Sequence, residues 1–236
     1  MASTVIKNWD NKTWLSSPNY IKSINKFILK NLSLNSNHKI LDIGCGRGKI
    51  IGALSSKLKL KVKPLGIDII RHKDKDKRIN FKKINALKFS LIDNQKFDLI
   101  LIKQTIHLMK LNEIKSLLRL LKKKVSSNGK ILIFTLDTGK NEIPTFNLMK
   151  LKLNKSLKRD QKIQKMIKKL YPHGIKKNFV FKVKIKKKKY IEMLKNRYIS
   201  TLIPFSKKQL IQGIHEIETD YNQILKFKDK LTCIIL

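Results

Sequence analysis

Residues 39–50, KILDIGCGRGKI, join an apolar run to a glycine-rich turn. The run ends at the carboxylate of Asp42, glycines follow at positions 44, 46 and 48, and apolar residues then return at helical spacing. A strand that enters such a turn and continues as a helix is typical of an open α/β sheet, in which ligands bind at the carboxyl ends of the strands. Glycine permits the tight turn and the close approach of a ligand to the backbone. The stretch therefore predicts a ligand-binding site directly after a buried strand.

The spacing of the glycines separates three kinds of ligand-binding loop. A dinucleotide-binding GxGxxG loop would need its third glycine at the position of Lys49, and a P-loop would need Ser or Thr at the position of Ile50. The observed order DxGxGxG instead resembles the first motif of the class I S-adenosylmethionine-dependent methyltransferases. Later segments agree with this family in order and spacing, and the resemblance is clear over residues 38–136.

Strands and helices alternate over the next hundred residues. Four further apolar runs are predicted to contain strands, and they lie within residues 63–70, 78–89, 96–106 and 126–136. Continuous apolar runs belong to parallel sheets that are covered on both faces. We therefore expect an α/β fold. The resemblance implies a Rossmann-like doubly wound, mostly parallel seven-stranded sheet with helices on both faces and a small helical cap inserted before the last strand.

The chain has 236 residues, of which 42% are hydrophobic, and no stretch has the composition of a linker. This length and hydrophobic content are enough for one large core. Residues 1–236 are therefore expected to form a single methyltransferase domain. Its predicted parts are an N-terminal helical segment, a cofactor-binding core, a region with the cap and an edge strand, and a final strand. They span residues 1–36, 37–136, 137–223 and 224–236.

Several elements outside the core have their own signals. Ser17 followed by Pro18 predicts the start of a helix within residues 16–32. Residues 178–190 alternate as an edge strand would. Helices are predicted over residues 192–203 and 206–221.

The resemblance implies S-adenosylmethionine as the cofactor and S-adenosylhomocysteine as the product. It implies that the glycine loop passes beneath the methionine part, that Asp42 meets the amino group, and that Asp68 binds both ribose hydroxyls. A carboxylate suits the ribose because it accepts two hydrogen bonds at once. Ile69 would pack on the adenine, and Asn85 stands where many family members have an acidic residue. The expected cofactor-binding residues are Asp42, Gly44, Cys45, Gly46, Gly48, Asp68, Ile69, Asn85, Ala86 and Lys103.

In this family, residues after the fourth strand surround the methyl group. His107 is the candidate catalytic base, or else a histidine that lines the pocket without transferring a proton. Gln104, and Tyr20 from the first helix, are expected to contact the substrate. Residues 190–217 resemble the substrate cap of the trans-aconitate methyltransferase group, which would place Arg197 over the pocket to bind an acidic substrate. No Cys/His cluster with ligand spacing predicts a metal site.

The formal net charge of +38 leaves the kind of acceptor open. A charge of this size is typical of proteins that bind nucleic acid or anionic membranes. However, 48 of the 54 basic residues are lysine, whereas sites that read phosphate geometry favour arginine. An AT-rich coding sequence also produces many Lys, Ile and Asn codons.

The fourth predicted strand ends in KQTI, unlike the Asn-Pro-Pro-Tyr type of exocyclic-amine methyltransferases that act on nucleic acids. We therefore expect direct in-line methyl transfer to a small molecule, which would be acidic if Arg197 binds it. The alternatives are an RNA methyltransferase that uses the basic surface, and a non-catalytic S-adenosylmethionine-binding protein.

No apolar run approaches the ~20 residues needed to cross a bilayer, and the start MASTVIKNWDNK lacks the apolar region of a signal peptide. The protein is therefore expected to be cytoplasmic, without a membrane partner, and to be a monomer or homodimer. Two cysteines, Cys45 and Cys233, do not make a disulfide framework.

Overall fold

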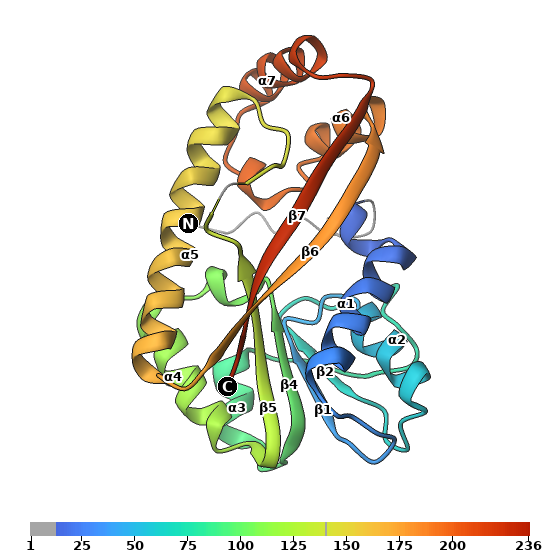
Figure 1. Ribbon diagram of the computed structural model, residues 1–236, viewed down its shortest axis with the longest axis vertical. Coiled ribbons are helices and arrows are strands. Elements are labelled where there is room, and N and C mark those ends of the chain that lie inside the picture. The colour runs from blue at the N-terminus through green and yellow to red at the C-terminus, as the bar shows by residue number, and fades with distance from the viewer. Residues whose placement is uncertain (1–12, 140) are drawn as a thin grey trace.

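The computed structural model describes residues 13–139 and 141–236, and these residues form a seven-stranded sheet (Figure 1). The first twelve residues of the predicted N-terminal segment lie outside this range. The strands are β1 (Ile40–Ile43), β2 (Leu65–Asp68), β3 (Asn80–Lys83), β4 (Phe97–Lys103), β5 (Val125–Leu136), β6 (Ile175–Lys186) and β7 (Ile224–Ile235). Their order in the sheet is β3-β2-β1-β4-β5-β7-β6. Neighbours from β3 to β5 pair in parallel, and β7 pairs antiparallel with β5 and β6. The predicted mostly parallel, Rossmann-like sheet is therefore confirmed.

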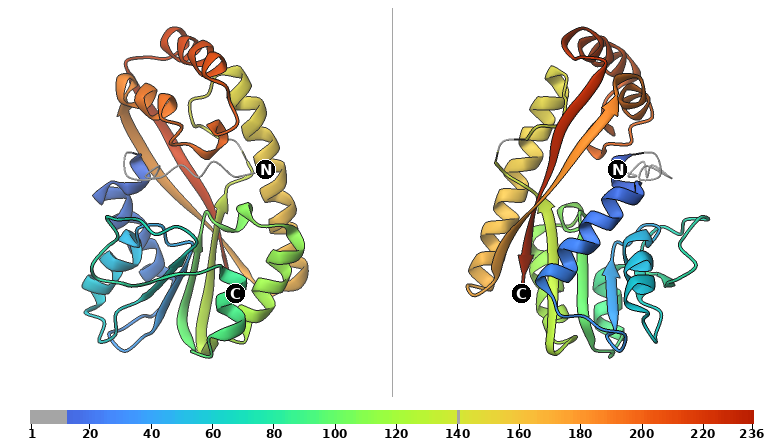
Figure 2. Two further views of the ribbon diagram at one scale, coloured as in Figure 1. Left: turned by 180° about the vertical axis from the view of Figure 1, so that it is seen from behind. Right: turned by 45° about the vertical axis from the view of Figure 1, so that its right-hand side comes forward.

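Helices cover both faces of the sheet, as Figure 2 shows from two further directions. The helices are α1 (Pro18–Asn31), α2 (Lys49–Leu58), α3 (Ala86–Ile92), α4 (Leu111–Lys122), α5 (Asn147–Leu170), α6 (Lys187–Lys195) and α7 (Lys207–Asp220), with short 3-10 turns η2 (Trp14–Ser16), η3 (Ile106–Leu108) and η4 (Ser200–Leu202). One core lies between the sheet and helices α1 and α2. A second core lies between the opposite face and helices α3, α4 and α5.

Helix α1 begins where the sequence predicts. The Ser17 side chain accepts a hydrogen bond from the Tyr20 backbone N–H at 3.2 Å, and Pro18 occupies the first turn, where no backbone donor is needed. The side chains of Tyr20, Ile24 and Ile28 then repeat on one face and are fully buried against the sheet. Their burial fixes the helix against β6 of the sheet and beside α2.

Strands β6 and β7 form a two-stranded ribbon that extends beyond the rest of the sheet (Figure 1). They pair over twelve residues each, whereas β5 meets only the last part of β7. At the far end, α6 and α7 pack on the inner face of the ribbon and form a third core, which is the predicted cap. Exposed lysines occupy the outer face, where Lys182 lies opposite Lys228 and Lys184 opposite Lys226.

The predicted helix over residues 192–203 is wrong, because α6 ends at Lys195. Arg197 adopts a left-handed backbone with φ of 52°. Its N–H donates to Leu194 O at 3.0 Å, and the Tyr198 N–H donates to Met193 O at 3.0 Å. These two bonds form a Schellman motif, which closes a helix. Helical structure resumes only at η4.

The predicted edge strand, residues 178–190, is shifted toward the N-terminus, because β6 begins at Ile175 and ends at Lys186, and Lys187 begins α6. The Lys187 side chain is only 8% exposed. Its Nζ donates to Glu218 O at 2.6 Å and to Tyr221 O at 2.7 Å. A lysine of the basic run therefore satisfies carbonyl groups at the end of α7.

Replacing Lys187 with methionine should destabilise the protein by about 1–3 kcal/mol, because two carbonyl groups lose a charged donor. Lys188 follows directly and is exposed, so Lys188→Met is the matched control and should change stability by less than about 0.5 kcal/mol. Urea unfolding of the three proteins measures both effects. Equal losses in the two variants would contradict the assigned role of Lys187.

Candidate active site

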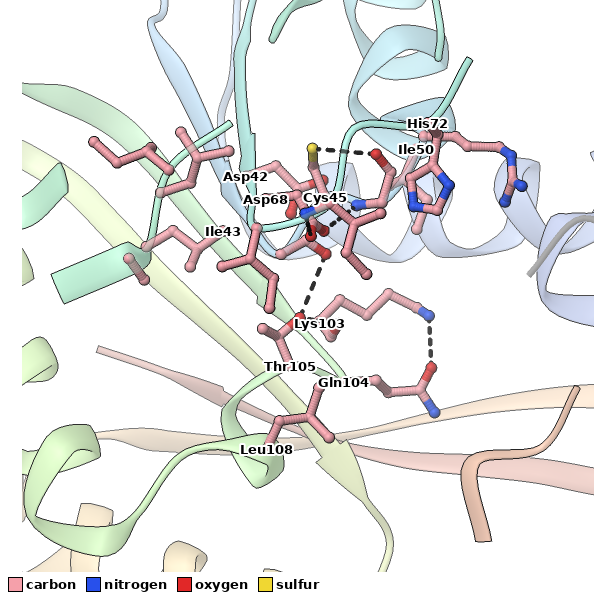
Figure 3. A pocket seen from close by; sticks show the side chains of 18 of the residues that line it. Asp42, Ile43, Cys45, Ile50, Asp68, His72, Lys103, Gln104, Thr105 and Leu108 are labelled. Atoms are coloured by element: carbon pink, nitrogen blue, oxygen red, sulfur yellow. Dashed lines mark hydrogen bonds between the residues drawn. The ribbon is translucent and has the colours of Figure 1, made fainter. Parts of the chain in front are cut away.

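A pocket of about 360 Å³ lies at the carboxyl ends of β1, β2 and β4 (Figure 3). Strand β1 has β2 on one side and β4 on the other. The strands that follow β1 in the chain therefore lie on opposite sides of it, first β2 and β3, then β4 and β5. Such a switch point opens a crevice for ligands at the carboxyl ends of the strands. The walls come from the loops after β1, β2, β3 and β4 and from residues of η2 and α1.

The three glycines after β1 share a left-handed backbone. Their φ angles are 70° at Gly44, 54° at Gly46 and 70° at Gly48, a region that other residues adopt at a cost. Space is also short, because a Cβ on Gly44 would lie 2.2 Å from Thr105 Oγ1 and one on Gly48 would lie 2.1 Å from Ile79 Cδ1. The loop therefore requires glycine for both conformation and packing.

Asp68 ends β2 and connects it to the glycine loop. Its Oδ2 accepts a hydrogen bond from the Gly46 N–H at 2.9 Å, and its Oδ1 accepts one from the Ile70 N–H at 3.0 Å. A carboxylate has about four acceptor sites, so these two bonds leave capacity for a ligand. Asp68 thus orders the loop and also faces the pocket.

Asp42 is the next-to-last residue of β1 and lies in the pocket wall with 4% of its surface exposed. Burial raises the pKa of its carboxyl to about 7, the Lys103 ammonium opposes this rise, and the Asp68 carboxylate adds to it. The group therefore changes its charge near neutral pH.

The substitution Asp42→Asn should change how stability depends on pH. The Asp42 carboxyl titrates near 4 in an unfolded chain and near 7 in the fold, so between these values the folded state holds the extra proton. The free energy of unfolding of the wild type should therefore fall as pH rises through this range. Thermal unfolding should show the variant gaining about 1–3 kcal/mol on the wild type between about pH 5 and pH 7.5. A difference that is constant with pH would refute this account of Asp42.

Lys103 ends β4 on the opposite side of the pocket from β2. Its Nζ donates to Gln104 Oε1 at 2.8 Å and lies 5.1 Å from the centroid of the Tyr20 ring. Burial lowers the pKa of the ammonium to about 8, and the carboxylates of Asp229 and Asp42 partly oppose this shift. A partly buried cation with adjacent acids is thereby held beside the glycine loop.

Gln104 has a left-handed backbone, with φ of 51°. The conformation is uncommon for a residue other than glycine and is often found at functional sites. The Gln104 N–H donates to Phe134 O at 2.9 Å, which holds this turn at the end of the sheet. The strained backbone places the amide against Lys103 in the pocket (Figure 3).

Asp229 on β7 lies behind this end of the pocket and is 2% exposed. Its Oδ2 accepts a hydrogen bond from Trp14 Nε1 at 2.8 Å. The bond ties η2 to the ribbon, and the next residues, Leu15 and Ser16, line the pocket. Asp229 is the acid within KFKDK, at an inward-facing position of an alternating strand, and this was the available sequence signal for its role.

A further loop after β2 is held by Arg47, the residue between the second and third glycines. Its side chain is 1% exposed, and its Nε donates to Asp74 at 2.7 and 2.8 Å. Within the same loop, His72 lines the pocket. Sequence reasoning missed this contribution because the loop resembles an ordinary polar turn.

The structure brings most of the predicted site residues together. Those that line the pocket are Asp42, Gly44, Cys45, Gly46, Asp68, Ile69, Asn85, Ala86, Lys103 and Gln104. Gly48 shapes the loop and begins α2. The Asn85 side chain caps α3, since its Oδ1 accepts from the Leu87 N–H at 2.8 Å.

Four predicted residues do not line the pocket: Gly48, described above, and Tyr20, Arg197 and His107. Tyr20 is fully buried against the rings of Phe179 and Phe181, because α1 turns this side chain toward the sheet. Arg197 lies in the cap, where its Nη2 donates to Phe205 O at 2.8 Å and its backbone closes α6.

His107 is also absent from the pocket wall. It lies in η3, and burial, followed by the charge of Arg159, lowers its pKa to about 4. The imidazole is therefore neutral at physiological pH. Neither the candidate base nor the candidate substrate arginine therefore lines the pocket in this structure.

Residues 34–198 match the family described as a methyltransferase domain. The match spans more than half of the chain, so the chain belongs to this family. The expected class, the class I S-adenosylmethionine-dependent methyltransferases, is confirmed at the level of family and fold. The particular likeness to the trans-aconitate group stays a prediction. Comparison with curated protein sequences gives no match.

Solved structures show the same fold. A protein from Anabaena variabilis, described as a methyltransferase from an antibiotic biosynthesis pathway, has a TM-score of 0.61 and 13% identity over 90% of this chain and 95% of that chain. The YcgJ protein from Bacillus subtilis has a TM-score of 0.55 and 14% identity, covering 89% and 96%. The plantazolicin methyltransferase BpumL, in complex with S-adenosylhomocysteine, has a TM-score of 0.52 and 18% identity, covering 97% and 86%. At these identities the likeness concerns the fold.

No helix between residues 13 and 236, with residue 140 left aside, is long and apolar enough to cross a membrane. In the same part of the chain, no group of three or more His, Cys, Asp or Glu side chains is arranged to hold a metal ion.

Proposed function

We propose that the protein transfers a methyl group from S-adenosylmethionine to a small acceptor molecule by direct in-line transfer. The observation that supports this most is the convergence of Asp42, the glycine loop and Asp68 on one pocket at the switch point of the sheet. The cofactor, when bound, supplies a methyl group that is already activated on a sulfonium. The protein side chains then need mainly to position the reactants and exclude water.

The pocket residues fit this cofactor. Asp68 retains acceptor capacity for ribose hydroxyls beyond its two backbone bonds. Ile69 is an apolar side chain on the pocket wall that is 59% exposed, as suits a residue that covers an adenine ring. Asp42 would pair with the amino group once ionised, and the bare backbone of Gly46, whose N–H donates to Asp68, also lies on the pocket wall.

We assign the β4 side of the pocket to the acceptor. Lys103 offers an ammonium and Gln104 an amide, and both lie across β1 from Asp68. Together they would bind a carboxylate or hydroxyl of the acceptor and orient its nucleophile. Lys103, which the family resemblance placed among the cofactor-binding residues, thereby takes the substrate-binding role that the resemblance gave to Arg197. Leu15 and Leu108 line the same pocket and would help to exclude water.

Two further observations support a small acceptor. Exposed lysines occur on α1, α2, α4, α5, α7 and both ribbon strands, as expected from a lysine-rich composition rather than from one nucleic-acid surface. The titles of two neighbouring structures name an antibiotic biosynthesis pathway and plantazolicin, which describe those proteins. Neither of those contexts is RNA modification.

Asp68→Ala should weaken S-adenosylhomocysteine binding by at least about tenfold, because it removes hydrogen-bond acceptors and loosens the glycine loop. Asp93→Ala is the control, since Asp93 lies outside the pocket and pairs with Lys82 at 3.6 Å. Isothermal titration calorimetry should show wild-type affinity in the control. Absence of binding in the wild type, or equal affinity in all three proteins, would refute the cofactor assignment.

The acceptor class can be tested with radiolabelled methyl groups. Purified protein and labelled S-adenosylmethionine are incubated with a metabolite extract or with total RNA at about 0.15 M salt. Label should enter the small-molecule fraction and be lost with Asp68→Ala. Label confined to RNA would establish the nucleic-acid alternative, and no transfer to either fraction would favour a non-catalytic binding protein.

A further inference from the structure

A second hollow, of about 490 Å³, lies between the start of α4 and the middle of α5, and is termed here the basic groove. Its lining residues are Lys110, Leu111, Asn112, Lys155, Lys158, Arg159 and Lys162. Five of these seven side chains are cationic and none is acidic. Lys155 and Lys162 are about 10 Å apart along the helix axis, so the cations of α5 form a row rather than a point.

The acidic residues nearest in sequence face elsewhere. Asp160, the single acid of α5, is 2% exposed and accepts a hydrogen bond from the Leu136 N–H at 3.1 Å. Glu113 accepts the Lys110 N–H at 2.7 Å and lines the first pocket. In the part of the chain that the structure describes, no lining cation of the basic groove is within 4 Å of a carboxylate. Within this part of the chain, the lining cations therefore have no direct carboxylate partner, and only Arg159 interacts electrostatically with the buried Asp160.

Clustering of these cations destabilises α5. Lys158 and Lys162, and likewise Lys155 and Arg159, are four residues apart on one helix, where like charges repel. Arg159 is also held in place, because its Nη2 donates to Met109 O at 2.6 Å. A bound anion would remove the repulsion and would meet a guanidinium that is already oriented.

The basic groove adjoins the proposed active site. Leu108, Met109 and Glu113 line the first pocket, whereas Lys110, Leu111 and Asn112 line the groove. Residues 108–113 therefore form a shared wall. The hydrogen bond between Arg159 and Met109 ties α5 to this wall. A single ligand could cross the wall and occupy both hollows.

We propose that the basic groove binds phosphate groups of the methyl acceptor, whose nucleophile lies in the first pocket beside Lys103 and Gln104. The proposal rests on the proposed function and specifies its substrate class. A phosphate has several acceptor oxygens and about two negative charges, so it matches a row of cations better than one carboxylate would. The same chemistry occurs in phosphorylated metabolites and in nucleic acids, and the experiment separates these sources.

The test uses two probes, inorganic tripolyphosphate by calorimetry and a labelled twelve-nucleotide RNA by fluorescence anisotropy, at about 50 and 200 mM salt. The groove variant is Lys155→Gln, Lys158→Gln and Lys162→Gln combined. The control is Lys22→Gln, Lys26→Gln and Lys30→Gln combined, which removes the same charge from exposed positions of α1. S-adenosylhomocysteine affinity is measured for each protein and should be equal in all three.

The groove variant should lose about tenfold in tripolyphosphate affinity, because three ionic contacts disappear, while the control stays within about twofold of the wild type. With RNA, the slope of log affinity against log salt should become shallower by about 2 in the groove variant alone. Tripolyphosphate binding without RNA binding would assign the phosphates to a small acceptor. RNA binding in the groove would assign them to a nucleic acid.

Equal losses in both triple variants, or no binding of either probe to the wild type at about 50 mM salt, would overturn the proposal. The cofactor measurement keeps this result apart from the proposed function. A wild type that binds S-adenosylhomocysteine but neither probe refutes only the groove. A wild type that binds a probe but not S-adenosylhomocysteine refutes the methyltransferase proposal, and with it the assignment of the phosphates to a methyl acceptor, while anion binding in the groove stands.

Discussion

The pocket depends on the hydrogen bond from the Gly46 N–H to the Asp68 carboxylate, which joins the ends of two neighbouring strands. The N–H groups of Gly44 and Cys45 add to this connection by donating to Ile67 O at 2.8 and 3.1 Å. These three bonds attach the loop after β1 to the end of β2. They form only because the loop adopts left-handed backbone angles, which glycine accepts at low cost. The positions of the two site carboxylates follow from this attachment.

A chain of buried charges extends from the pocket to the ribbon. The charges of Asp42, Lys103 and Asp229 alternate in sign, and each shifts the pKa of a neighbour. Trp14 donates to the last carboxylate, so the N-terminal turn, the sheet and the ribbon meet at one polar group. Isolated buried charges are costly, and compensation of this kind makes them tolerable. The proposed acceptor end is therefore positioned by segments from both ends of the chain.

The strands, and the residues that line the β1 and β2 side of the pocket, could be predicted from the sequence because both depend on short-range patterns. A residue at or next to the end of a parallel strand lies at the ligand edge whatever packs around it, and Asp42 and Asp68 are of this kind. Tyr20 and Arg197 do not line the pocket, because rotation of a helix and its closing turn decide where a side chain points. The contact between Trp14 and Asp229 joins residues 215 positions apart, and no local pattern contains it.

The lysines on the outer face of the ribbon affect how two molecules can approach each other. Strand β6 is a twelve-residue edge strand whose far half projects beyond the parallel sheet. A long open edge invites a second chain to add a strand, which leads to aggregation. Here any arriving strand would approach the facing lysine pairs 182–228 and 184–226. The repulsion costs some stability within the molecule, and in exchange it disfavours self-association through the exposed edge.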